Sequence, residues 1–278
     1  MTTASPIYCR ASMNYTRRDA DDTCATEVDV HDGRHAKLCA QLPAWTECGF
    51  ELLSHPAAIA DWNDDVAIVG VHYAELEQLA RALTGCDYAL VAGHIKRNPA
   101  QAAVHADYAP IAYVHSDFAA SYGAALREMY SNDGEGSSVA LARAGITADV
   151  VRGASRTVVL QFWRNIGPEI MDLPLAFCDA RTVPASDVRA VPVLNYANSG
   201  FNFDTLAMLP PAVPGSHGWY VFPEMTAQEV VAFRTYDSAR TATGQAFWTP
   251  HSAFHDPRVP LGQPSRSSIE LRATCLFV

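Results

Sequence analysis

One short stretch constrains the fold of this chain more than any other: residues 113–118, an apolar segment that carries His115 and Asp117 two positions apart. Side chains at positions i and i+2 of a strand leave the same face, so this imidazole and this carboxylate converge if the segment is extended. The two groups make a metal site only when another part of the chain supplies a further ligand. The stretch therefore predicts a strand that lies next to a second segment from far away in the sequence.

A candidate for that second segment carries His251; Arg266 follows it by fifteen residues, and Ser268 lies two positions further on. Two histidines and one carboxylate form the facial triad of non-haem Fe(II) oxygenases, which leaves positions open for a co-substrate and O2. An arginine and a hydroxyl two residues apart on a strand match the far carboxylate of 2-oxoglutarate. Fe(II), 2-oxoglutarate and O2 are therefore candidate cofactors of this chain.

Two further arginines compete for the anchor of the co-substrate. Arg272 shares a strand face with Arg266. It either binds the co-substrate or pairs with a buried carboxylate such as Glu270 or Asp179. Arg164 ends the clearest strand signal of the chain, where it either meets a buried anion or marks a strand end at the surface. Both arginines are candidate cofactor-binding residues.

A second His-x-Asp pair, His105 with Asp107, lies ten residues before the first. Spacing alone does not separate the two pairs. The simpler explanation of either pair is a histidine that is hydrogen-bonded at a strand end. The choice between them depends on what else the fold brings to each pair.

Composition excludes several classes of partner. The chain has 278 residues, of which 49% are hydrophobic and 18% charged, as expected of one large globular domain. Its net charge of −10 and the lack of a Lys/Arg-rich run argue against nucleic acid. No apolar run approaches the roughly 20 residues of a membrane span, so we expect no membrane and a cytoplasmic protein. Seven scattered cysteines without a Cys-x-x-Cys motif indicate free thiols.

Many short strands follow a helical first third, and no βα unit repeats. A helical period covers residues 57–84, and strand signals occupy residues 88–92, 156–165, 219–222, 230–236 and 268–277. This order predicts a mainly β protein with flanking helices around a jelly-roll core rather than a doubly wound sheet. We expect residues 1–45 to form an irregular N-terminal arm and residues 46–278 one domain. The Pro- and Asn-rich residues 184–215 are expected to form a loop over the active site.

Several blocks of the sequence resemble the hydroxylase/desaturase family of non-haem iron/2-oxoglutarate-type oxygenases. They are residues 49–56, 114–118, 162–166, 174–181, 219–226, 236–238, 249–254 and 266–272. The resemblance runs from about residue 46 to the end and implies a double-stranded β-helix of the cupin type. It implies that His115, Asp117 and His251 bind Fe(II). It also favours this His-x-Asp pair, because the family's motif is followed by a segment that ends in arginine, here Arg127.

Two departures from the family pattern concern the site. Asn165 follows Trp163 and Arg164 where the family has proline, and we expect this change to alter the substrate pocket. His255 adds a competing metal ligand shortly after the distal histidine. Both positions therefore need to be located in the fold.

Together the residues and the resemblance imply an enzyme, a dioxygenase that acts on a small secondary metabolite. Oxidation of 2-oxoglutarate to succinate would leave a ferryl species, which hydroxylates or desaturates the substrate. One alternative keeps the metal and the fold but uses no 2-oxoglutarate, as in an isomerase or an oxidase that takes electrons from its substrate. Another is a binding protein whose metal site is vestigial. The sequence leaves the substrate open.

Overall fold

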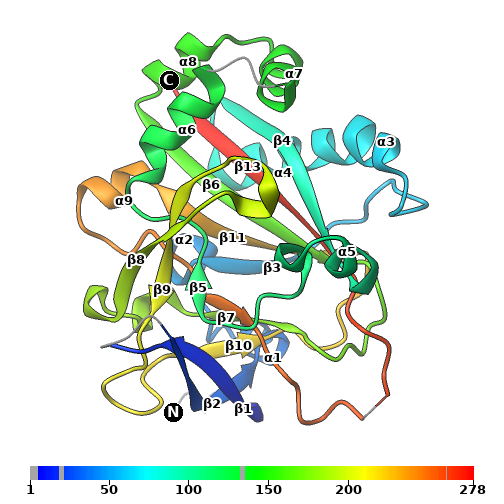
Figure 1. The fold of residues 1–278 in the computed structure, drawn as a ribbon, viewed down its shortest axis with the longest axis vertical. Coiled ribbons are helices and arrows are strands. Elements are labelled where there is room, and N and C mark those ends of the chain that lie inside the picture. The colour runs from blue at the N-terminus through cyan, green and yellow to red at the C-terminus, as the bar shows by residue number, and fades with distance from the viewer. Residues whose placement is uncertain (1–5, 19–21, 132–134, 261) are drawn as a thin grey trace.

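The computed structural model describes residues 6–18, 22–131, 135–260 and 262–278. The strands form two sheets that curl into a jelly roll, which confirms the predicted mainly β class (Figure 1). The five-stranded sheet has the order β3 (Phe50–Ser54), β11 (Glu229–Asp237), β6 (Arg156–Asn165), β13 (Ser268–Phe277) and β4 (Tyr88–Arg97). The eight-stranded sheet has the order β1 (Ile7–Thr16), β2 (Thr23–Asp32), β10 (Trp219–Val221), β7 (Leu175–Cys178), β12 (His251–Ala253), β5 (His115–Ser116), β9 (Phe203–Met208) and β8 (Val188–Val193).

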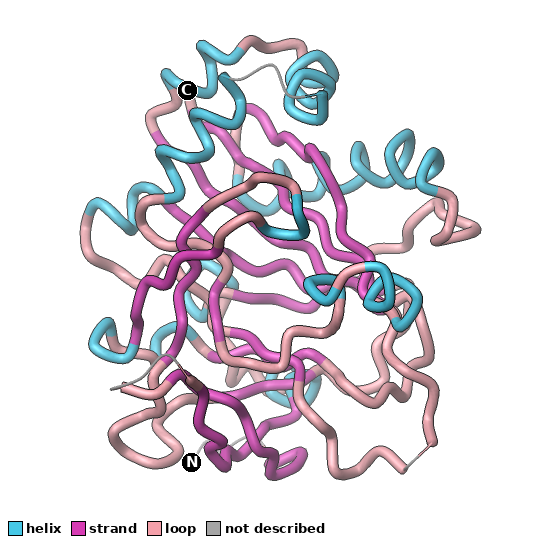
Figure 2. The backbone as a smooth tube through the Cα atoms, viewed as in Figure 1, coloured by secondary structure: helices cyan, strands magenta, loops and turns pink. Residues whose placement is uncertain are grey.

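Helices lie at the periphery, and strands fill the centre (Figure 2). The α-helices are α1 (Gly33–Leu38), α2 (Trp45–Cys48), α3 (Asp65–Ala67), α4 (Tyr73–Thr84), α5 (Pro99–Val104), α6 (Tyr122–Ser131), α7 (Glu135–Ala144), α8 (Ala148–Gly153) and α9 (Ser238–Ala242). A π-helical turn, Ile68–His72, joins α3 to α4. Within the predicted helical segment 57–84, helical structure thus begins at Asp65, where the Asp64 side chain caps α3, and not at residue 57 as expected. None of the helices in the described ranges is long and apolar enough to cross a membrane.

Two inner strands of the five-stranded sheet, β6 and β13, place polar side chains inside the barrel. On β6 and β13 alternate side chains point to opposite faces. One face packs against α4 in an apolar core that includes Leu160, Phe162, Ile269 and Leu271. The other face of β13 carries polar and charged residues, among them Glu270, which is also buried. Apolar packing on the outer face therefore holds a row of polar side chains inside the barrel.

The first 32 residues are not irregular, so that expectation is wrong for the part that the structure describes. β1 and β2 pair antiparallel, and β2 continues the eight-stranded sheet by pairing parallel with β10. Cys9, Ala11, Met13 and Tyr15 alternate along β1 and are buried in the main core. Polar residues alternate with them, which is the period-two pattern of a half-buried strand. The proposed division between an arm and a domain at residue 45 stays a prediction.

The segment of residues 184–215 was expected to be a loop, but it contains an antiparallel hairpin of β8 and β9. Residues 194–202 join the two strands. This connection contains a short 3-10 turn, Tyr196–Asn198, in which Ala197 has a positive φ of 49°. β9 pairs in turn with β5, so the hairpin lies directly beside His115.

Candidate active site

Three side chains converge inside the barrel: His115 and Asp117 from β5 and the turn that follows it, and His251 from β12. The two strands are antiparallel neighbours, and His251 lies directly opposite His115 in their register. Asp117 Oδ1 is 3.6 Å from His115 Nε2 and 3.4 Å from His251 Nε2. All three potential ligand atoms lie within 4.8 Å of one another, and all three residues are buried. Strand pairing therefore assembles the group that the sequence could only suggest.

Backbone carbonyls fix the orientation of both imidazoles. His115 Nδ1 is 2.9 Å from the carbonyl of Tyr113, and His251 Nδ1 is 3.0 Å from the carbonyl of Thr249. A carbonyl can only accept, so in each ring Nδ1 is the donor, and Nε2 is the nitrogen that faces Asp117. Burial, together with the nearby His251, lowers the pKa of His115 to about 3. His115 is therefore neutral at physiological pH, as a metal ligand must be.

Asp117 is ionised although it is buried. Its Oδ2 accepts hydrogen bonds from Nε and Nη2 of Arg272, at 3.0 and 2.7 Å. Burial raises the pKa of Asp117, but Arg272 and the two histidines lower it more, so the pKa lies well below its usual range. Two imidazoles and one carboxylate form a donor set that suits non-haem Fe(II).

A small cavity of about 20 Å3 adjoins the three ligands and contains donors and acceptors without partners. Arg266 and Trp163 line it, and neither Arg266 Nε nor Trp163 Nε1 has a hydrogen-bond partner within the described structure. Gln161 Oε1, which also lines the cavity, likewise has no hydrogen-bond partner within the described structure. Burial and the nearby Arg97 lower the pKa of Arg266 to about 10, so Arg266 remains a cation at neutral pH. Buried unpaired donors beside a cation are suited to an anionic group.

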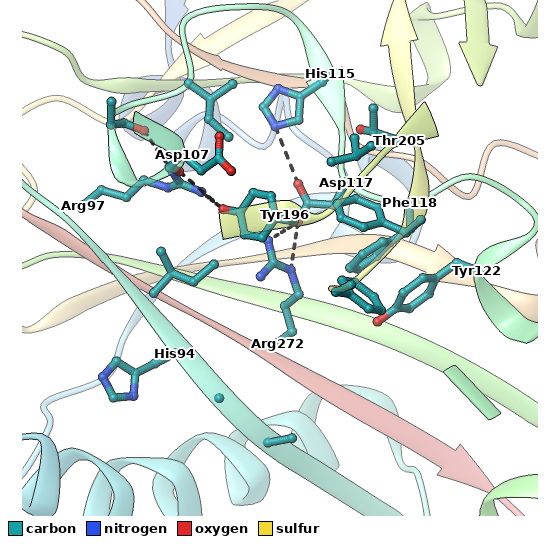
Figure 3. Close-up of a pocket in the computed structure, with 18 of the residues that line it drawn as sticks. His94, Arg97, Asp107, His115, Asp117, Phe118, Tyr122, Tyr196, Thr205 and Arg272 are labelled. Atoms are coloured by element: carbon teal, nitrogen blue, oxygen red, sulfur yellow. Dashed lines mark hydrogen bonds and ion pairs between the residues drawn. The ribbon is translucent and has the colours of Figure 1, made fainter. Parts of the chain in front are cut away.

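A larger cavity of about 590 Å3 also borders His115 and Asp117, and Figure 3 shows part of its lining. Aromatic rings form one wall: Phe118 stacks on Tyr122 with 3.6 Å between centroids, and Phe203 meets Phe118 edge-on at 5.7 Å. Tyr196 comes from the connection between β8 and β9, and its hydroxyl accepts a hydrogen bond from Arg97 Nη2 at 3.2 Å. A cavity of this size accommodates a drug-sized molecule.

Comparisons with known proteins identify the family of this chain. A family model described as "Oxidoreductase/YMDC permease-like domain" matches residues 2–276. The hydroxylase/desaturase efuI from Hormonema carpetanum is 30% identical over 233 residues, which cover 81% of this chain and 75% of efuI. The chain belongs to this family of oxidoreductases, the hydroxylase/desaturase family of Fe(II)/2-oxoglutarate-dependent oxygenases.

A second relative and a solved structure are also similar to this chain. CTB9 from Cercospora beticola, also named a hydroxylase/desaturase, is 25% identical over 243 residues, which cover 81% of this chain and 69% of CTB9. A solved structure of the iron and alpha-ketoglutarate-dependent endoperoxidase NvfI superposes with a TM-score of 0.77 at 20% identity, over 99% of both chains. The likeness to NvfI establishes the shared fold.

The structure does not bring every predicted site residue of this family member to the cavities. Arg164 lies on the outer face of β6, where its Nη1 donates to the carbonyls of His55 and Ala227. Ser268 is buried on β13 but lines neither cavity. His255 is exposed and lies outside the ligand cluster. Asn165 also lines neither cavity, because its side chain donates to the carbonyls of Pro168 and Met225.

Three residues at the cavities were missed in the sequence. Gln161 and Trp163 lie on the inner face of β6, where their i, i+2 spacing was visible but the apolar neighbours dominated the strand signal. Arg97 ends β4 and lines both cavities, although the strand was expected to stop at residue 92. A polar residue at every second position of an otherwise apolar strand was the available signal.

Proposed function

We propose that this member of the hydroxylase/desaturase family binds Fe(II) through His115, Asp117 and His251 and oxidises a small metabolite with 2-oxoglutarate and O2. One observation carries the proposal: the potential ligand atoms of two imidazoles and one ionised carboxylate lie within 4.8 Å of one another, and His115 and Asp117 line both cavities. Bound iron would supply the activation of O2 that accompanies decarboxylation of 2-oxoglutarate. The protein's part is to hold three ligands on one side and to leave the opposite side open.

Arg266 is our candidate for the anchor of the far carboxylate of 2-oxoglutarate. It is the cation with an unpaired Nε in the small cavity, and Trp163 adds an unpaired indole N–H. The co-substrate needs more room than about 20 Å3, so binding must displace side chains or draw on the larger cavity, which shares Arg97 and Ile111 with the small one. A contribution from Ser268 stays a prediction.

The substrate we propose is neutral and largely apolar. Charged side chains that line the larger cavity already have partners: Arg97 with Glu270, Arg272 with Asp117, and Asp107 with the backbone N–H of Ala197. A charged substrate would have to compete with these contacts, whereas the aromatic wall favours an apolar molecule. Comparing a neutral candidate metabolite with its carboxylated analogue would test this point, because only the neutral form should accelerate release of succinate.

An anaerobic titration tests the main proposal. Protein loaded with Fe(II) should develop a visible charge-transfer band when 2-oxoglutarate is added. A folded, iron-loaded protein without such a band would overturn the proposal. Succinate formed in proportion to oxidised product would exclude the alternative in which the same fold and metal work without 2-oxoglutarate.

We also infer a reducing, cytoplasmic environment. All seven cysteines are free thiols, and five of them are buried. Structural disulfides mark oxidising compartments, so free thiols support a reducing one. Protein isolated without reductant should be alkylated at all seven cysteines after unfolding; a disulfide in that material would contradict the assignment.

A further inference from the structure

The two oxygens of the Asp117 carboxylate have different neighbours. Oδ1 faces the two histidines, at 3.6 and 3.4 Å from their Nε2 atoms. Oδ2 accepts two hydrogen bonds from one guanidinium, that of Arg272 on β13 (Figure 3). Arg272 thus occupies the oxygen that points away from the histidines. One side of the carboxylate is committed to the arginine and the other is directed at the proposed iron site.

Buried neighbours fix the position of the Arg272 guanidinium. Its Nη2 lies 3.6 Å from Glu270 Oε1, and the same oxygen accepts a hydrogen bond from Arg97 Nη2 at 2.9 Å. Arg97 is fixed in turn, because its Nη1 donates to the carbonyls of Asp107 and Ala109. The guanidinium of Arg272 also lies over the ring of Phe118, 5.5 Å from its centroid. A row of alternating charges therefore fixes the cation that holds the ligand.

We propose that Arg272 is a positioning residue that holds the Asp117 carboxylate so that Oδ1 is directed at the metal together with the two histidine Nε2 atoms. A carboxylate without such a partner can rotate, and Oδ1 then no longer completes the ligand set. Because Arg272 also holds Oδ2, the remaining coordination positions stay open for co-substrate and O2. The inference rests on the proposed iron site. It gives Arg272 a role separate from the co-substrate anchor that we assign to Arg266.

The direction in which metal affinity changes when Arg272 is replaced separates a positioning role from a simple charge effect. A cation 2.7 Å from a ligand oxygen repels a metal dication, so if Arg272 acted only through its charge, removing it would tighten metal binding. Loss of a residue that orients a ligand instead weakens metal binding by about 10- to 100-fold. Substituting lysine adds a second test, because it retains the charge but not the fork that grips one oxygen with two N–H groups.

The experiment is an anaerobic titration with Co(II), in the absence of 2-oxoglutarate, followed by the Co(II) absorption spectrum. Co(II) takes the same nitrogen and oxygen ligands as Fe(II). We expect Arg272→Gln and Arg272→Lys both to bind Co(II) about 10- to 100-fold more weakly than the wild type. The matched control is Arg164→Gln: this buried arginine lies on the outer face of β6, lines neither cavity and donates to the carbonyls of His55 and Ala227, so its Co(II) affinity should be unchanged.

Thermal melting of the metal-free proteins checks that each variant is folded. If Arg272→Gln does not fold, Arg272→Lys carries the test, since it retains the positive charge between Asp117 and Glu270. Unchanged or tighter Co(II) binding by a folded Arg272 variant would overturn the inference. Failure of the wild type to bind Co(II) would instead remove the iron site on which the inference rests.

Discussion

The two His-x-Asp pairs have the same sequence spacing and the same internal distance, yet the structure uses them differently. The nearest imidazole nitrogen and carboxylate oxygen are 3.6 Å apart both in the pair His105/Asp107 and in the pair His115/Asp117. The first pair borders a 3-10 turn, Ala106–Tyr108, with side chains 28% and 41% exposed. The second lies at β5, with side chains 5% and 7% exposed.

The comparison shows that proximity within a motif does not make a metal site. The second pair gains His251 from a neighbouring strand and a fixed guanidinium from Arg272. The first pair serves local structure: His105 Nδ1 accepts the backbone N–H of Asp107, and the Asp107 carboxylate accepts that of Ala197. The second pair differs from the first because its side chains are buried, are held in a fixed orientation and are joined by a third ligand.

Removing ligands from each pair gives the largest expected difference. His115→Ala, Asp117→Ala and His251→Ala should each abolish Co(II) binding and succinate release, because a set of three ligands tolerates no loss. His105→Ala should leave both nearly unchanged, measured by the same titration and by product analysis. The comparison fails if the first pair proves essential and the second dispensable.

Arg266→Leu should raise the concentration of 2-oxoglutarate needed for half-maximal activity by about 10- to 100-fold, the cost of losing a charge-assisted contact. Steady-state kinetics at saturating Fe(II) would measure it. Arg164→Leu is the matched control, because this buried arginine lies on the outer face of β6 and lines neither cavity. The control should lose thermal stability and keep its 2-oxoglutarate requirement; an equal effect of both changes would remove Arg266 as the anchor.

Burial of His72, a histidine outside the proposed iron site, should make the folded protein less stable in acid. Burial lowers the pKa of His72 to about 4, although a hydrogen bond to Glu75 opposes the shift. A histidine with a depressed pKa in the folded state takes up its proton more readily when unfolded. Its contribution to stability is therefore complete above about pH 6.5 and lost as the pH falls towards 4.

The free energy of unfolding of the wild type should consequently drop more steeply than that of His72→Gln over this pH range, by about 2 kcal/mol. Urea unfolding at several pH values between 7.5 and 4.5 measures the difference, with His105→Gln as the less buried counterpart. Parallel pH profiles for wild type and His72→Gln would show that burial of His72 does not control acid stability.

The smallest effect is expected at the first pair. Asp107→Ala removes the acceptor for the backbone N–H of Ala197 and loosens the connection that carries Tyr196. One hydrogen bond of about 0.5–1.5 kcal/mol predicts a rise in the KM for substrate of about 2- to 10-fold, with Co(II) affinity unchanged. Asp107→Asn keeps an acceptor oxygen and should behave like the wild type. A loss of Co(II) affinity in Asp107→Ala would connect the two pairs and end the contrast.

Regular local patterns were recovered from the sequence. The β-branched and aromatic residues 156–165 coincide with β6, and the final strand signal coincides with β13. The predicted helical period ends at residue 84, as α4 does, and Gly85 is the left-handed C-cap of that helix. Alternating patterns were not recovered: β1 and the hairpin of β8 and β9 differ from the predicted irregular arm and loop. Period-two alternation is a weak signal where the buried positions are small or mixed in character.

The sequence by itself determined which side chains share a face. In an extended segment the spacing of two residues places His115 with Asp117, and Glu270 with Arg272, on one face. Only the tertiary structure decided which His-x-Asp pair meets His251, that Arg272 grips Asp117 while Arg266 remains beside the small cavity, and that Arg164 faces outward. The reason is physical: alternation along one strand follows from local backbone geometry. Contacts between strands instead depend on register, and the charge of a buried group depends on the partners that packing brings to it.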